Sequence, residues 1–255
     1  MLGSSSVRGL NERVALVTNG AHGVGRAIAI QLSFTGAYVI VAHHDGDTAG
    51  SQVVAELREL GTLAYGLAVD ISKAAGVARL FESVNEMFGR LDILVNVAGA
   101  SEDIAFGDLS EDDWDRVIAA DLKSAFLCAQ AAVPLMKNRP SPAIVQIVGA
   151  SGLAGRFGGA HYVAAHAGII GLTKALARDL AAPRIRVNCV AVGRITEGIA
   201  RQGASMPPPG TTRTPPDKAN LIHAAPDEIA RACLYLISPE ARLINGQTIT
   251  VGSEW

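Results

Sequence analysis

The sequence predicts an α/β fold in which a doubly wound parallel sheet of about seven strands carries helices on both faces. Short runs rich in β-branched residues alternate along the chain with longer segments of helical pattern. The short runs are apolar throughout, which is typical of strands buried on both faces of a parallel sheet. No internal repeat and no linker divides the 255 residues, so we expect a single domain over residues 1–255.

The strands are expected wherever a short aliphatic run is bounded by glycine or polar residues. They are Val14–Val17, Tyr38–Ala42, Leu63–Val69, Ile93–Asn96, Ile144–Val148, Arg186–Ala191 and Gln247–Val251. The expected helices lie between them, at Gly25–Phe34, Thr48–Leu60, Ala74–Phe88, Glu111–Met136, Tyr162–Leu180 and Pro226–Leu236. The proline-rich segment at about 194–220 breaks this alternation. A loop this long in a compact domain is usually a lid or a disordered segment, and we expect a lid.

Composition narrows the class of protein. With 49% hydrophobic and 5% aromatic residues, the core must be filled mainly by aliphatic side chains. The net charge of -2 gives no electrostatic reason to expect nucleic acid or an anionic membrane as a partner. The first nine residues contain no apolar signal-like region, and we expect no later run that spans a bilayer. A cytoplasmic protein is therefore expected.

Cysteine usage fits the same compartment. Cys128, Cys189 and Cys233 are odd in number, far apart and set in apolar segments. They predict buried reduced thiols rather than disulfides or a metal site, and we expect no metal ion.

A glycine-rich loop follows the first expected strand and leads directly into a helix. Glycines at such a turn let the backbone approach a pyrophosphate, and the helix N-terminus offers unpaired N–H groups and a positive dipole end. The pattern predicts a dinucleotide site, although a tight turn that binds nothing would use the same glycines. The candidate cofactor-binding residues here are Thr18, Asn19, Gly20, His22, Gly23, Val24 and Gly25.

Tyr162 and His166 lie four residues apart at the start of an almost uncharged helical segment, Ala160–Lys174. With the glycine loop and Asn96-Val-Ala-Gly99, this segment resembles the classical type of the short-chain dehydrogenase/reductase family. The resemblance extends from Arg13 to Val251. It implies a Rossmann-type fold, an NAD(P)(H) cofactor and a small-molecule substrate with a carbonyl or secondary alcohol group.

The resemblance also implies an altered catalytic tetrad. The family uses Asn, Ser, Tyr and Lys, whereas this chain aligns Asp121, Gly149, Tyr162 and His166 with those positions. Ser151 follows Gly149 by two residues and could replace the serine only if the loop shifted. A free phenol has a pKa near ~10 and needs a neighbouring cation to act at neutral pH, whereas histidine is mostly neutral there. Asp121 could stabilise His166 as an imidazolium, directly or through water. The candidate catalytic residues are Tyr162, His166, Asp121 and Ser151.

Further cofactor contacts are implied by the resemblance. Histidines at the end of the second strand, rather than a carboxylate, favour NADP over NAD, with NAD still possible. His22, His43 and His44 could meet at the 2′-phosphate, or they could be exposed loop histidines. Val192 replaces a family proline, and Glu197 replaces a threonine near the cofactor, so the nicotinamide end departs more from the family. The remaining implied contacts are Asp70, Ile71, Asn96, Ala98, Gly99, Tyr162, His166, Gly193 and Ile195.

Two of the expected helices indicate how the protein assembles. The segments Glu111–Met136 and Tyr162–Leu180 carry few charges, so their outer sides need a cover, and we expect a homodimer or homotetramer.

The function expected first is an oxidoreductase that uses Tyr162 as proton donor and acceptor. A non-catalytic subunit in a hetero-oligomer with an active homologue is one alternative. A non-redox dehydratase, isomerase or cyclase is the other.

Overall fold

The computed structural model describes residues 9–99, 103–156, 158–182, 184–195 and 223–252. One sheet of seven parallel strands runs through them in the order β3-β2-β1-β4-β5-β6-β7. The strands are β1 (Val14–Val17), β2 (Tyr38–His43), β3 (Ala64–Ala68), β4 (Ile93–Val97), β5 (Ala143–Gly149), β6 (Arg186–Val192) and β7 (Thr248–Val251). The predicted doubly wound parallel sheet is therefore confirmed. From β1 the next strands in the chain, β2 and β3, are added on one side, and β4 to β7 are added on the other. The switch point between β1 and β4 is the position at which such folds bind ligands.

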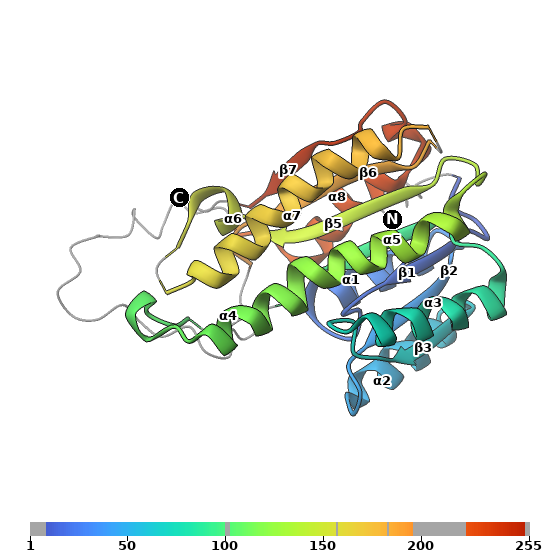
Figure 1. Cartoon of the computed structure of the whole chain (residues 1–255). Coiled ribbons are helices and arrows are strands. Elements are labelled where there is room, and N and C mark those ends of the chain that lie inside the picture. Colours follow the sequence, from blue (N-terminus) through green and yellow to red (C-terminus); the bar gives the residue numbers. More distant parts are fainter. Residues whose placement is uncertain (1–8, 100–102, 157, 183, 196–222, 253–255) are drawn as a thin grey trace.

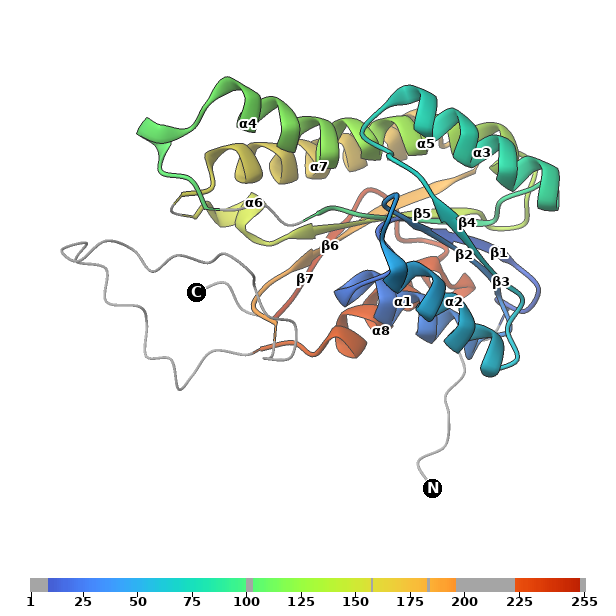
Figure 2. The ribbon, with the colours of Figure 1, turned by 90° about the horizontal axis from the view of Figure 1, so that it is seen from below.

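Helices cover both faces of the sheet, as Figures 1 and 2 show. One face carries α1 (Gly23–Ser33), α2 (Thr48–Glu59) and α8 (Pro226–Ile237). The other carries α3 (Ala74–Phe88), α5 (Ser124–Met136) and α7 (Ala160–Asp179). The shorter elements are η1 (Phe106–Asp108), α4 (Glu111–Val117), η2 (Ile118–Lys123), α6 (Ser151–Ala154) and η4 (Pro239–Ala241).

Buried aliphatic side chains form a core layer on each side of the sheet. In β1, Ala15 and Val17 belong to the layer beneath α1 and α8, whereas Val14 and Leu16 belong to the layer beneath α3 and α5. This alternation is the period-two geometry of a strand. Both sets are apolar because both faces are covered.

The segment expected as one helix, Glu111–Met136, is interrupted. A six-residue π-helix, η2, separates α4 from α5 and contains the buried Asp121. π-helical turns are rare and occur frequently at functional sites. The hydrophobic pattern of the segment did not reveal this turn.

The same segment corrects the expectation that no run could span a bilayer. By length and composition, Glu111–Met136 is long and apolar enough, with a mean hydropathy of 1.3. Its residues Cys128, Ala129, Ala132 and Met136 are buried in the core layer under α5. A core helix of a soluble protein passes the same test of length and composition.

The three cysteines are free and buried, as predicted. Burial raises the pKa of Cys128 and of Cys189 to about 12, which makes both poor nucleophiles. Of the expected lid at 194–220, residues 196–220, with Glu197 among them, lie outside the described residues.

Candidate active site

The turn between β1 and α1 has the backbone geometry that the glycine pattern predicts. Asn19 and Gly23 have positive φ values of 48° and 50°, and the Asn19 side-chain amide donates a hydrogen bond of 2.7 Å to the Val97 carbonyl. A Cβ atom on Gly25 would overlap the Asn19 carbonyl oxygen. Asn19 therefore adopts the left-handed conformation in the place of the family glycine and also ties this turn to β4.

The N-terminus of α1 is suited to an anion. Its first turn has no acidic residue, and the side chain of His22, the N-cap, makes no capping hydrogen bond. The amide groups of this turn and the positive end of the helix dipole are therefore available to a phosphate. The described residues thus fit the pyrophosphate of a dinucleotide.

A cavity of about 170 Å³ lies beside this turn, at the carboxyl ends of the strands. It is lined by Asn19, His44, Val69, Asp70, Ile71, Ser72, Gly99, Ala120 and Asp121. Several candidate residues from distant parts of the sequence therefore meet at one cavity.

Asp70 is fixed as a carboxylate at the edge of this cavity. The Ser72 hydroxyl and amide both donate to Oδ1 of Asp70, and the Lys73 ammonium lies 3.0 Å from Oδ2. These partners lower the pKa of Asp70 to about 2, with the Ser72 hydroxyl as the largest cause. Asp70 is therefore a charged acceptor at every physiological pH.

The three histidines do not all line this cavity. His43 is buried, and its ring packs where a Cβ atom on Gly50 would lie, and it does not line the cavity. His22 pairs with Asp47 at 2.8 Å. Only His44 of the three lines the cavity.

His166 is hydrogen-bonded through both ring nitrogens. The Gly149 amide donates to Nδ1 at 2.6 Å, and Nε2 lies 3.2 Å from Oδ2 of Asp121. The amide therefore engages the lone pair of Nδ1, and Nε2 faces the carboxylate. The other oxygen of Asp121, Oδ1, accepts from the Gly99 amide at 2.7 Å.

Tyr162 lies between two side chains and against the end of β5. Its ring stacks on His166 with centroids 3.7 Å apart, and the guanidinium carbon of Arg156 lies 4.1 Å from the centroid. A Cβ on Gly149 would overlap the Tyr162 hydroxyl. The phenol therefore occupies the space that a serine side chain at position 149 would need.

The other candidate residues lie around this centre. Ser151 begins α6 and is buried. The remaining candidates connect the ends of neighbouring elements. Thr18 and Ala98 connect β1, β4 and β5, and the Asn96 side chain donates to the Ala125 carbonyl of α5. The Gly193 amide donates to the Val251 carbonyl, and Ile195 forms a β-bridge with Ala224.

Sequence reasoning missed three residues at this site, namely Arg156, Asp103 and His161. Arg156 pairs with Asp103 at 2.6 Å, and His161 is fully buried. Burial lowers the pKa of His161, and the charge of Arg156 lowers it further. Arg156 lies in a glycine-rich loop without periodicity, so only its closeness to Tyr162 in sequence could have singled it out.

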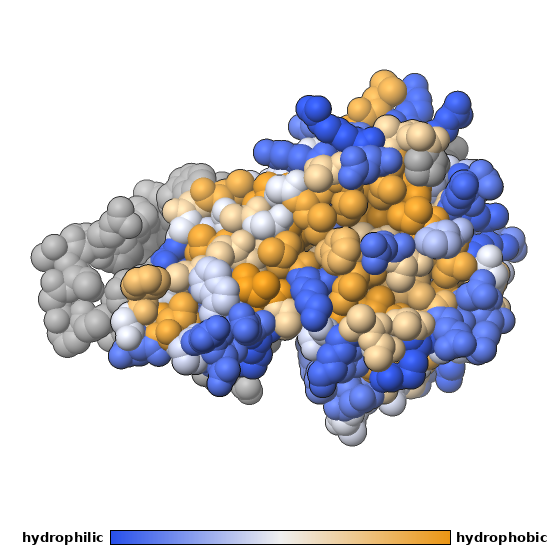
Figure 3. All heavy atoms as spheres, viewed as in Figure 1, coloured by the Kyte–Doolittle hydropathy of each residue, from blue (hydrophilic) through white to orange (hydrophobic). Residues whose placement is uncertain are grey.

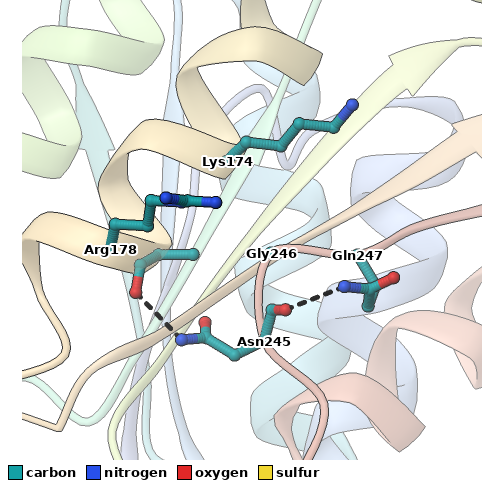
Figure 4. A pocket seen from close by; sticks show the side chains of 6 residues that line it. Lys174, Arg178, Asn245, Gly246 and Gln247 are labelled. Atoms are coloured by element: carbon teal, nitrogen blue, oxygen red, sulfur yellow. Dashed lines mark hydrogen bonds between the residues drawn. The ribbon is translucent and has the colours of Figure 1, made fainter.

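A second cavity, about 370 Å³ in volume, lies elsewhere, between α7 and the connection from β6 to β7 (Figure 4). It is lined by Lys174, Ala177, Arg178, Asn245, Gly246 and Gln247. Lys174 is twelve residues beyond Tyr162 on the same helix, which places it roughly 18 Å along the axis. This cavity is therefore separate from the tyrosine and the glycine turn.

Comparison with known proteins places the chain among oxidoreductases. The family model described as enoyl-(acyl carrier protein) reductase matches residues 20–253. The 3-oxoacyl-(acyl-carrier-protein) reductase of Staphylococcus aureus is 36% identical over 239 residues, which cover 93% of this chain and 95% of that protein. The corresponding reductase of Escherichia coli is 34% identical, over 94% and 95% of the two chains.

A solved structure agrees with these relatives. A short-chain dehydrogenase from Burkholderia cenocepacia, in complex with NADP, matches with a TM-score of 0.82 and 29% identity, over 95% of this chain and 97% of that chain. The chain belongs to the short-chain dehydrogenase/reductase family.

Proposed function

We propose that this protein is an NADP(H)-dependent oxidoreductase that acts on a carbonyl or secondary alcohol, with Tyr162 as the proton donor and acceptor. One observation carries the proposal. Tyr162 stacks on His166, His166 bonds to Asp121, and Asp121 lines the cavity beside the glycine turn. The reactive hydroxyl and the nucleotide cavity are thus linked by direct contacts.

The cofactor would be held mainly by its adenosine and pyrophosphate groups, whose binding residues lie within the part of the chain that the structure describes. The amides at the start of α1 would bind the pyrophosphate, and His44, Asp70 and Ile71 would surround the adenosine. When bound, the nicotinamide supplies or accepts the hydride. Tyr162 exchanges a proton with the substrate oxygen, and the relatives' names make 3-oxoacyl thioesters the first substrate class to test.

The rate is expected to be low. Gly149 provides no side-chain donor to the substrate oxygen, and the loss of one such donor typically costs about 100- to 1,000-fold. His166 accepts the Gly149 amide at Nδ1 and faces Asp121 through Nε2, so it does not replace the cation of the family lysine. The geometry therefore supports slow reduction rather than efficient turnover.

The test combines calorimetric titration of NADPH with turnover of a 3-oxoacyl thioester and of a simple ketone. Tyr162→Phe should keep NADPH binding and abolish reduction. Reduction that is unchanged in this variant would overturn the proposed role of Tyr162. Absence of NADPH binding by the wild type would overturn the cofactor assignment.

A second candidate function, a non-catalytic subunit, is favoured by a specific contact. The Tyr162 hydroxyl fills the space of a serine side chain at position 149. Apolar side chains also gather over α5 and α7 on one face of the molecule (Figure 3), where a partner subunit would bury them. Co-expression with an active homologue, followed by isolation of a mixed oligomer whose turnover exceeds that of either protein alone, would favour this candidate.

We also place the protein in the cytoplasm as a homodimer or homotetramer through these two helices. The exposed aromatic ring of Phe126 on α5 supports this assembly, because 42% of that residue remains accessible in the isolated chain.

A further inference from the structure

Arg156 brings a permanent positive charge to the face of the Tyr162 ring. Its guanidinium carbon lies 4.1 Å from the ring centroid, on a ring that also stacks against His166 at 3.7 Å. A cation this close to an aromatic face is attracted by the ring, and it attracts the phenolate more strongly than the phenol.

The position of Arg156 is built into the surrounding backbone. The guanidinium pairs with Asp103 at 2.6 Å, and both side chains are about four-fifths buried, with 19% and 21% exposed. A Cβ on Gly159 would overlap the Arg156 side chain, so a residue without a side chain is needed there. The Ile104 amide also donates to the Gly158 carbonyl at 2.7 Å, which ties the loop before α7 to the segment that carries Asp103.

We propose that Arg156 is a positioning residue that supplies Tyr162 with the cationic neighbour that its proton chemistry needs. The proposal rests on the proposed function in that Tyr162 is the residue that moves a proton. His166 cannot supply this charge, because its Nδ1 accepts the Gly149 amide and its Nε2 faces Asp121. A guanidinium remains charged at every working pH.

The other charged and titratable groups around Tyr162 modify this effect without reversing it. Asp103 partly offsets the charge of Arg156. The Asp121 carboxylate contacts Nε2 of His166 at 3.2 Å. His161 precedes Tyr162 on α7, and burial together with the charge of Arg156 lowers its pKa. Arg116 and Asp113 form their own pair on α4.

The first test is an absorbance titration of the phenol in the full-length protein without cofactor. Tyr162→Phe gives the signal of the other three of the four tyrosines, and subtraction isolates Tyr162. Arg156→Gln should raise the pH midpoint of the Tyr162 transition by about half a unit or more. Arg156→Lys should restore part of the shift, and Asp103→Asn should lower the midpoint. Arg178→Gln, an exposed arginine on α7, is the matched control and should leave it unchanged.

The outcomes separate this inference from the proposed function. A midpoint in Arg156→Gln equal to that of the wild type overturns the inference. If Arg156→Gln does not fold, Asp103→Asn decides, and an unchanged midpoint there overturns it. The expected shifts in a protein that shows no turnover would support the role of Arg156 while the proposed function falls.

Discussion

The backbone amide of Gly149 donates a hydrogen bond of 2.6 Å to Nδ1 of His166. This bond joins the end of β5 to α7 and engages the lone pair of Nδ1, while Nε2 faces Asp121. Protonation of Nδ1 would set two N–H groups against each other. His166 is therefore a structural acceptor and not a lysine substitute.

Restoring the family serine should harm the protein. In Gly149→Ser the new Cβ overlaps the Tyr162 hydroxyl, and overpacking of this kind typically costs about 1–3 kcal/mol. Urea denaturation should show a free energy of unfolding lower by that amount. Gly107→Ala is the matched control, since nothing lies within 4 Å of its Cβ position. Equal stability of the two variants would show that Tyr162 moves aside easily.

Nicotinamide cofactor binding should depend on pH through His44. We expect NADPH to bind more tightly than NADH, and more tightly at pH 6 than at pH 8, because His44 lines the cavity and histidine is the residue type whose charge ordinarily changes in this pH range. His44→Gln should remove most of the pH dependence in calorimetric titrations. His22→Gln should remove less, because His22 already pairs with Asp47. A pH dependence that survives His44→Gln would contradict this assignment.

Asp70 should stabilise the protein in a pH-dependent way. Its folded pKa of about 2 lies below the ordinary 3.8, so its contribution is complete above pH 3.8 and is lost as the pH falls toward 2. Because the side chain is 27% exposed, we expect Asp70→Asn to cost about 1 kcal/mol at pH 7. Denaturation of wild type and variant across this range is the measurement. Asp45→Asn, an exposed aspartate in the preceding loop, should show no such loss.

Assembly should depend on the outer side of α7. Ala167 is exposed whereas Ala165 is fully buried against the sheet, so arginine at the two positions should act differently. Ala167→Arg should yield a folded monomer by light scattering, because an unpaired charge in an interface is costly. Ala165→Arg should unfold the chain. A monomeric wild type would contradict the proposed assembly.

The strands and most helices could be predicted because their signals are local. The continuous apolar runs identify β1 to β7, and the observed bounds differ from the expected ones by no more than two residues. The conformation of the glycine turn could also be predicted, because asparagine tolerates the positive φ that Asn19 adopts in the place of the family glycine.

The errors arose where contacts cross between segments. His43 lies on a strand buried on both faces, so the alternation of side chains gave no sign that its ring packs against Gly50. The pair of Arg156 with Asp103 joins positions 53 residues apart, 156 minus 103, and no spacing rule connects them. The acceptor role of Nδ1 of His166 depends on a backbone amide from another element, which the sequence cannot identify.

The π-helical turn at Ile118–Lys123 makes this part of the chain sensitive to changes in length. An α-helix advances about 100° per residue, so refolding the six residues of η2 as α-helix, with their number unchanged, would rotate α4 relative to α5. Asp121 could then keep its place beside Gly99 and His166, or α5 could keep its apolar side on the sheet, but not both. An insertion or a deletion in α4 or α5, outside this turn, would be more damaging than most substitutions, because the two helix surfaces would lose their relative phase.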